Sequence, residues 1–407
     1  EHAQNIVGLP FEAIVEDGSP HGDKYFTFWN PPVIDEAKTR RRSPNSEAAF
    51  LLNELVQKEI RSLVFAGTRK LTELIYIYAQ EQLSPSQRDK ISPYRAGYLP
   101  EERRRIEHQF FEGELLGLVA TTALELGINI GDLDATVLTG YPGSIASAWQ
   151  QAGRSGRSTH SSLSFLIAQE NPLDQYLMRN PTFFFSKNFD NAIINPANPY
   201  VLKPHLLCAA WEKPLEDKDK EFFGPTTGTI LTELEQEGGL RKRHERWHPA
   251  PSISYPAQDI NIRATSGQNY AVIDGRDGCL LETVEASVAF FQVHPGAIYL
   301  HQGESYLITE LDLARHIAWA EAKSVDYYTQ TMEITDIRIT RLLKEKTCQK
   351  TKAYFGDVDV TTRVVGFKRK KQFTDEVVTE EFLDLPPQNF PTKALWFDLP
   401  QKAIDRI

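Results

Sequence analysis

Short apolar runs alternate with segments of helical periodicity between residues 47 and 168, and this alternation restricts the fold more than any other feature of the chain. Residues 52–60 and 70–83 repeat apolar side chains at the spacing of a buried helix face. The intervening apolar runs, typical of buried strands, are residues 62–66, 115–120, 135–139 and 163–168. Strands that alternate with helices form a parallel sheet with helices on both faces. The sequence therefore predicts an α/β domain over residues 46–190.

The segments on either side of this domain have different patterns. Residues 1–45 contain a β-prone run at 25–29 and predict an entry strand followed by a connector. Two candidate helices at 202–212 and 227–237, followed by a basic hairpin, predict a winged helix over residues 191–255. Strand-like runs dominate residues 256–365, with one helix expected at 311–319, and predict a small β-rich, barrel-like domain. We expect the proline-punctuated residues 366–407 to form a C-terminal tail.

The composition excludes several classes of protein. The chain has 407 residues, 41% hydrophobic and 25% charged, with a net charge of −10, so it is not a disordered protein. No apolar run is long enough to cross a membrane, and no signal peptide is present. Three widely spaced cysteines fit neither a disulfide framework nor a zinc motif. We therefore expect a cytoplasmic protein without membrane contact, and the start at Glu1 suggests a piece of a longer one.

The segment Gln150–Arg157 carries the strongest chemical signal. Arg154 and Arg157 are three residues apart, with Gly153 and Gly156 beside them. On a helix this spacing places both guanidinium groups on one face, where they can bind one anion, and arginine suits phosphate because its planar fork binds oxygens bidentately. Taken alone, the segment is better explained as a surface helix with two solvated arginines.

The surroundings of this segment favour the phosphate-binding interpretation. Val119–Ile130 leaves a strand into a threonine-rich turn, where a hydroxyl and helix N-terminal amides can hold a phosphate. Further upstream lie Val64–Arg69 and Tyr94–Tyr98. These four elements, in this order, resemble motif IV, the segment after it, motif V and motif VI of the second RecA-like lobe of a superfamily 2 helicase.

Further matches narrow the resemblance and cover nearly the whole chain. They are Pro10–Ile14, Phe28–Pro32, Leu124–Gly131, His205–Ala210, Leu383–Pro387 and Ala394–Phe397. These segments are similar to the mitomycin-repair (YprA-type) DNA helicases, relatives of a fungal RecQ-four-like helicase. The resemblance implies an ATP-dependent 3′-to-5′ DNA helicase used in DNA repair, with a winged helix after the motor and a C-terminal zinc module.

The chain departs from this family in two respects. It contains neither a GxxxxGK[ST] motif nor an Asp-Glu-x-His box, so the first RecA-like lobe, which would hold ATP and Mg²⁺, is missing. The four-cysteine cluster is also missing, so we expect no zinc site. The resemblance therefore implies half of an ATPase site, which needs the first lobe of the same protein as its partner and should not hydrolyse ATP alone.

The resemblance also implies roles for individual residues. Arg154 and Arg157 would approach the γ-phosphate of ATP, with Arg157 as the more direct arginine finger, and Gln150 would orient the phosphate or the attacking water. Gly127, Asn129 and Gly153 would close the nucleotide cleft; Asn129 stands where many relatives have Asp. The residues expected to contact the tracking single strand of DNA are Thr68, Arg69, Gly97 and Thr121.

The hairpin residues Arg241, Lys242 and Arg243, next to Trp247, suit phosphate contact with base stacking near a duplex junction, or simply a solvated surface. His294, His301 and His316 lack metal-ligand spacing, so we expect ordinary packing or exposure. Two other functions remain open from the sequence. The chain could be a catalytically silent nucleic-acid-binding scaffold, or a fragment of an RNA helicase, because motifs that track a backbone do not detect the 2′-hydroxyl.

Overall fold

The computed structural model describes most of the chain in two units, which are treated separately below. One unit comprises residues 1–18 and 190–269, and the other comprises residues 19–189 and 270–407. The described residues are 2–14, 18, 20, 22–35, 40–126, 131, 133–156, 159–187, 189, 195–260, 269–348 and 351–405.

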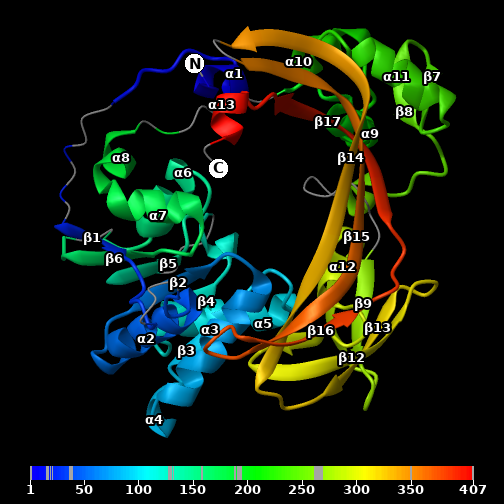
Figure 1. The fold of residues 1–407 in the computed structure, drawn as a ribbon. Helices are drawn as coiled ribbons and strands as arrows, with labels where there is room; N and C mark the ends of the chain where they lie inside the picture. Colours follow the sequence, from blue (N-terminus) through cyan, green and yellow to red (C-terminus); the bar gives the residue numbers. More distant parts are fainter. Residues whose placement is uncertain are drawn as a thin grey trace. The chain divides into compact units, whose positions relative to one another are not determined.

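The larger unit contains a six-stranded sheet in the order β1-β6-β5-β2-β4-β3 (Figure 1). All of its strand pairs are parallel. The strands are β1 (Lys24–Trp29), β2 (Ser62–Ala66), β3 (Ile91–Tyr94), β4 (Gly117–Ala120), β5 (Ala135–Thr139) and β6 (Ser162–Ile167). The expected α/β domain is confirmed, and the entry strand joins the sheet as its edge.

Helices cover both faces of this sheet. They are α2 (Pro44–Gln57), α3 (Arg69–Gln82), the short α4 (Pro85–Arg88), α5 (Pro100–Phe111), α6 (Ile145–Ala152), α7 (Pro172–Arg179) and α8 (Pro181–Ser186). Val64 and Ala66 of β2 pack with α2 and α3 in one core, whereas Leu63 and Phe65 pack with α5 and α6 in another. Because successive strand side chains point to opposite faces, one continuous apolar strand serves both cores.

The β-rich region begins with a five-stranded sheet in the order β10-β9-β13-β12-β11. Its elements are β9 (Asn269–Asp274), β10 (Leu280–Glu285), α12 (Ala286–Gln292), β11 (Ile298–His301), β12 (Glu304–Asp312) and β13 (Ile317–Ala322). The β-rich character is confirmed, although the sheet is open, with β10 and β11 as edges among the described strands.

The helix expected at residues 311–319 is wrong. Asp312 Oδ1 accepts the N–H groups of Ala314 and Arg315, both at 2.9 Å, so the chain turns there. His316 completes the turn with φ of 56°. An aspartate that bonds the backbone two residues ahead offers the chain a turn in place of a helix, and two strands are joined as a result.

A long antiparallel ribbon follows, formed by β14 (Tyr327–Cys348) and β15 (Thr351–Lys371) (Figure 1). β16 (Val377–Phe382) and β17 (Gln388–Phe397) both pair with β15, and α13 (Gln401–Ile404) comes after them. Residues 366–407, expected to be a tail, are therefore largely strands of this second sheet. The β-rich region packs on α3: Ile298, Leu300 and Tyr328 belong to the same hydrophobic core as the buried side chains of α3.

The smaller unit has the architecture of a winged helix. α9 (Pro199–Glu212) and α11 (Thr227–Gln236) pack around a core that includes Leu206, Leu231 and Trp247. Its shorter elements are α1 (His2–Val7), α10 (Lys220–Phe223) and the hairpin of β7 (Leu240–Arg243) and β8 (Arg246–Pro249). The expected winged helix with a basic hairpin is confirmed.

Candidate nucleotide and nucleic-acid site

The residues expected to bind nucleotide and nucleic acid follow the carboxyl ends of neighbouring parallel strands. Thr68 comes after β2, Thr121 after β4, and the loop before α6 after β5. Carboxyl ends of parallel strands meet at one edge of the sheet, which is where open α/β sheets bind their ligands. Thr68, Thr121 and the loop before α6 therefore lie at one edge of the six-stranded sheet. Ser155 and Gly156, by contrast, pair with Leu133 just before β5 begins.

Glu125 joins the motif V turn to the motif VI helix. Arg154 is 4% exposed, and its Nε donates to the main-chain oxygen of Glu125 at 3.0 Å, with a second bond from Nη2. The Glu125 carboxylate accepts from Ser147 Oγ at 2.8 Å and from Gln151 Nε2 at 2.9 Å. Three donors on or just after α6 thus hold one turn in place.

The prediction for Arg154 needs correction. Sequence reasoning placed its guanidinium on the γ-phosphate, but the structure turns it into the lobe, where it bonds Glu125. The reason is that the Glu125 carbonyl lies within reach of the residues after α6, and Arg supplies a rigid pair of donors for it. Glu125 and Gln151 were missed; the spacing of Ser147 and Gln151, one helix turn apart, is the signal that pointed to a shared partner.

Gln150 and Gly153 lie beside this junction. The Gln150 side chain is exposed at the end of α6, one position before the buried Gln151. A β-carbon on Gly153 would lie 2.8 Å from the main-chain oxygen of Trp149, so a side chain there would disturb the end of the helix. Gly156 has φ of 73°, a conformation that favours glycine. Gly127, Asn129 and Arg157 lie outside the described residues, and their nucleotide roles stay predictions.

Thr68 and Thr121 each begin a helical turn. Thr68 Oγ1 accepts the N–H of Leu71 at 3.2 Å and caps α3, and its side chain is exposed. Thr121 Oγ1 accepts the N–H of Ala123 at 3.4 Å before the 3-10 turn Thr122–Leu124. Free N–H groups at such starts attract anions.

Arg69 meets an acid that the sequence had not suggested. Its Nη1 lies 2.7 Å from Oε1 of Glu282, a β10 residue whose side chain is fully buried. A β-carbon on Gly97 would lie 1.6 Å from the same Oε1, so only glycine leaves room for this carboxylate. Where the sequence predicted a DNA phosphate beside Arg69 and Gly97, the structure places Glu282. A strand so distant in the sequence gives no local signal of this contact.

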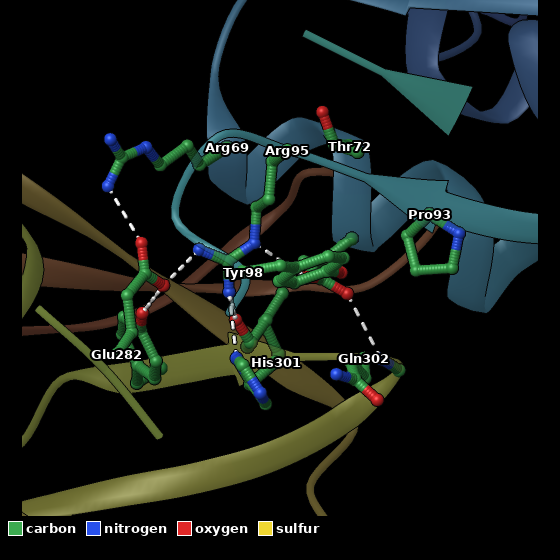
Figure 2. A network of polar contacts seen from close by, with 12 residues as sticks. Arg69, Thr72, Pro93, Arg95, Tyr98, Glu282, His301 and Gln302 are labelled. Atoms are coloured by element: carbon green, nitrogen blue, oxygen red, sulfur yellow. Dashed lines mark hydrogen bonds and ion pairs between the residues drawn. The ribbon is translucent and has the colours of Figure 1, made fainter. Parts of the chain in front are cut away.

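Arg95 is the centre of the buried polar network in Figure 2. Its Nε lies 2.8 Å from Glu73 Oε1, and Nη1 pairs with Glu282. Its Nη2 donates to Leu300 O at 3.0 Å and lies 3.2 Å from His301 Nδ1. Arg95 is 1% exposed, so each donor must be satisfied within the protein.

The tyrosines of this network stay neutral. Tyr98 donates its hydroxyl to Glu73 at 2.5 Å, and Tyr299 donates to Glu282. Burial, together with the neighbouring carboxylates, raises the pKa of both hydroxyls far above the usual value. Burial and then the charge of Arg95 lower the pKa of His301. A neutral His301 can accept a hydrogen bond from Arg95, and the network ties the lobe to the β-rich region.

The basic hairpin of the winged helix presents its cations to solvent. Arg241, Lys242 and Arg243 are all exposed on β7, before a turn in which His244 and Glu245 have positive φ. Lys242 Nζ lies 3.0 Å from Glu245 Oε2 and 5.5 Å from the centre of the Trp247 ring. In the described part of the chain, the side chains of Arg241 and Arg243 form no hydrogen bond or ion pair, so they are available to a ligand.

No described helix is long and apolar enough to cross a membrane. No group of three or more His, Cys, Asp or Glu side chains in the described ranges could hold a metal ion.

Two family models match the chain. The helicase conserved C-terminal domain matches residues 47–159, and the winged helix domain of the ATP-dependent helicase HRQ1 matches residues 194–265. The first range covers β2 to β5 with the Glu125–Arg154 junction, and the second covers the basic hairpin. Both matches agree with the architecture described above.

Among curated proteins, the chain is similar to an uncharacterized ATP-dependent helicase, YprA, of Bacillus subtilis (strain 168). The two are 37% identical over 403 residues, which is 98% of this chain and 54% of YprA. The ATP-dependent helicase hrq1 of Schizosaccharomyces pombe is 32% identical over 417 residues, covering 100% of this chain and 39% of hrq1. The chain thus spans about half, or less, of the length of the curated relatives it matches.

Solved structures extend the similarity to the fold. The crystal structure of the DUF1998 helicase MrfA bound to DNA has a TM-score of 0.81 at 36% identity, over 99% of this chain and 55% of that one. The complex of MrfA with DNA and AMPPNP has a TM-score of 0.77 at 36% identity, over 96% of this chain and 53% of that one.

Proposed function

We propose, since the chain belongs to the YprA- and MrfA-type family of superfamily 2 helicases, that it forms the second motor lobe and accessory domains of an ATP-dependent DNA helicase. The whole enzyme would translocate 3′ to 5′ on DNA and act in DNA repair. The relatives are named ATP-dependent helicases, and MrfA was solved with DNA and with AMPPNP, which supports the choice of ATP and DNA as ligands.

The observation that carries this proposal is the junction of Glu125 with Arg154. It fixes the turn after β4 to the end of α6 through a buried guanidinium. Two rigidly joined loops can approach a nucleotide as one surface, which preorganises the groups they carry. A solvated arginine on a surface helix would make no such contact.

We assign the nucleotide roles accordingly. Arg157, three residues after Arg154, would reach the γ-phosphate as the arginine finger. An arginine in this role contributes about 10³–10⁵-fold to turnover in other NTPases. Arg154 would be a positioning residue. The exposed Gln150 would orient the phosphate or the attacking water, and Gly127 and Asn129 would close the cleft.

ATP and Mg²⁺ would be held mainly by the first RecA-like lobe, since this sequence has no GxxxxGK[ST] motif. In this chain the exposed Gln150 would contribute a polar side chain to the supporting half of the site. We therefore propose that the chain does not hydrolyse ATP alone.

The DNA contacts are proposed on two surfaces. Thr68 and Thr121 begin helical turns whose N–H groups would hold phosphates of the tracking strand, with Arg69 and Gly97 nearby. Arg241, Lys242 and Arg243 of the winged helix would contact the backbone near a duplex junction. These contacts carry no base information, so the strand would be gripped without sequence preference.

ATP hydrolysis provides the test. We expect no turnover by this chain with or without DNA, and DNA-stimulated turnover once a first RecA-like lobe is joined to it. In that longer protein, Arg157→Ala should lower turnover by about 10³-fold or more and leave DNA binding nearly unchanged. If Arg157→Ala leaves ATP turnover unchanged, Arg157 is not the arginine finger.

Two other functions would give different results in these assays. A silent nucleic-acid-binding scaffold would bind DNA but show no turnover even with a first lobe present. An RNA helicase would unwind a matched RNA duplex faster than a DNA duplex. The DNA complexes of MrfA favour DNA, so we expect the DNA duplex to be unwound faster.

A further inference from the structure

A cavity of about 690 Å³ lies within the larger unit, between the starts of α2 and α3 and the strands β11 and β14. Its volume is in the range of small-ligand sites, about 300–1,000 Å³. Seven basic side chains line it, against two acidic ones, Glu170 and Asp375. The wall formed by Tyr328, Thr329 and Gln330 comes from the β-rich region, so the cavity reaches well beyond the motif IV loop.

Two helices begin at this cavity. α2 starts at Pro44 and α3 at Arg69, and each has 14 residues. The first N–H groups of a helix lack partners within it, and the helix dipole adds partial positive charge there. Two such starts at one cavity favour a negatively charged ligand.

Ser43 places a buried hydroxyl without a hydrogen-bond partner at this cavity, among the residues that the structure describes. It lines the cavity, is 6% exposed, and precedes α2 without capping it through its side chain. Its hydroxyl has no hydrogen-bond partner among the residues that the structure describes. A buried hydroxyl without a partner costs free energy, and such groups in folded proteins call for an explanation such as a ligand.

Two lysines at the cavity, Lys70 and Lys370, carry positive charge without a counter-ion among the described residues. Lys70 Nζ donates to Thr329 O at 2.6 Å, and neither Lys70 nor Lys370 forms an ion pair within the described ranges. Burial lowers the pKa of Lys70 to about 8, because its ammonium lacks solvation and has no carboxylate paired with it among the described residues.

Several other charges around the cavity are already matched. Arg69 and Arg95 pair with Glu282, and Arg42 pairs with Glu47 at 2.9 Å. The carboxylates have donors too: Glu170 accepts the N–H of Arg41 at 2.9 Å, and Asp375 accepts from Tyr328 at 2.8 Å. The hydroxyl of Ser43 therefore lacks a partner, and the side chains of Lys70 and Lys370, like those of Arg40 and Arg41, form no ion pair among the described residues.

We infer that this cavity binds a phosphate group, held by Ser43, Lys70, Lys370 and the start of α2. The phosphate comes either from a polynucleotide backbone or from free phosphate. In the first case the inference rests on the proposed function, and the β-rich region would contact the bound nucleic-acid strand together with the motor lobe. In the second case the cavity is a separate anion site.

The test uses the complete 407-residue chain. The double variant Lys70→Gln and Lys370→Gln removes both charges, and Lys371→Gln is the matched control, because Lys371 is exposed and does not line the cavity. One measurement is the affinity of a fluorescein-labelled single-stranded oligonucleotide at several salt concentrations. The other is the rise in melting temperature caused by inorganic phosphate.

If a polynucleotide supplies the phosphate, the double variant should bind the oligonucleotide about tenfold more weakly, with a salt slope smaller by about two. If free phosphate is the ligand, oligonucleotide binding stays the same and the phosphate-induced rise is lost. Lys371→Gln should match the wild type in both measurements. Neither measurement changing in the double variant would overturn the inference, while ATP turnover and Arg157 would be unaffected by that result.

Ser43→Ala separates binding from folding. Without ligand, its melting temperature should equal or exceed that of the wild type, because the variant removes a buried hydroxyl that has no partner. Ser43→Ala should also bind its ligand at least threefold more weakly. That ligand is the oligonucleotide or inorganic phosphate, whichever the double lysine variant shows to bind at the cavity. A lower melting temperature with unchanged affinity would contradict the role given to Ser43.

Discussion

The carboxylate of Glu282 lies against the α-carbon of Gly97, in the space that a side chain at position 97 would fill. A β-carbon there would be 1.6 Å from Glu282 Oε1. From this position the buried carboxylate pairs with both Arg69 and Arg95. The missing side chain on one loop of the motor lobe thus lets an acid of the β-rich region neutralise two arginines of that lobe.

Gly97→Ala should destabilise the larger unit. The new methyl group displaces a carboxylate that three partners hold, and overpacking of this kind costs about 1–3 kcal/mol. Urea denaturation gives the free energy of unfolding. Gly67→Ala is the matched control, since nothing lies within 4 Å of its β-carbon position, and we expect it to change stability by less than about 0.5 kcal/mol. Equal losses in the two variants would mean that Glu282 moves away freely.

Arg154→Ala should lower ATP turnover in the protein that includes a first lobe. Losing the two bonds to Glu125 O frees the turn after β4, and a misplacement of about 1 Å can cost 10²-fold in rate. Because Arg154 is buried, the variant should also lower the melting temperature, which loss of an exposed finger would not do. Steady-state kinetics and thermal melting measure the two effects.

Glu125→Gln is the control for that variant. It keeps the main-chain oxygen that Arg154 contacts, and its amide oxygen can still accept from Ser147 or Gln151. We expect a much smaller loss of turnover than in Arg154→Ala. If both variants lose turnover equally, the carboxylate and not the bond to the main chain holds the turn.

Alanine at Arg241, Lys242 and Arg243 should weaken DNA binding and flatten its dependence on salt. Each lost phosphate contact reduces the salt slope by about one. Since Glu245 already holds Lys242 at 3.0 Å, the two arginines should account for most of the change. Fluorescence anisotropy at several salt concentrations measures it. Lys218→Ala, an exposed lysine of the same unit paired with Glu216 at 2.7 Å, should leave affinity and slope unchanged.

Local patterns were enough to predict the motor lobe. β2 and β5 have the bounds expected from their apolar runs, because a parallel strand buried on both faces reads as a continuous apolar segment. Thr68 and Ser144 accept N–H bonds at the starts of α3 and α6, so those boundaries also depend on neighbours within a few residues.

The contacts of Arg95 could not be predicted in this way. Its partners Glu73, Glu282 and Leu300 come from three separate parts of the chain. β17 likewise finds its place through pairing with the distant β15. Arg154 shows a different limit: its motif gave no sign of the Glu125 carbonyl that its guanidinium contacts.

Acid should destabilise the larger unit through His294, which is 1% exposed and whose Nδ1–H donates to Pro295 O at 3.0 Å. Burial, with a smaller effect of Lys70, lowers the pKa of His294 from 6.5 to about 4. Between these values the unfolded chain binds a proton that the folded chain does not, so the free energy of unfolding falls as the pH falls through this window. The loss from this group is at most about 3 kcal/mol.

The variant His294→Gln removes this proton linkage, so its free energy of unfolding should fall less than that of the wild type between about pH 7 and about pH 4.5. Urea denaturation at both pH values measures the difference, and carboxylates that titrate in the same range cancel in the comparison. His108→Gln on α5 is the control, because the His108 side chain is exposed in the folded chain and should leave the wild-type pH dependence intact. If His294→Gln and the wild type lose the same stability in acid, His294 is protonated in the folded protein without cost, and its burial does not govern acid stability.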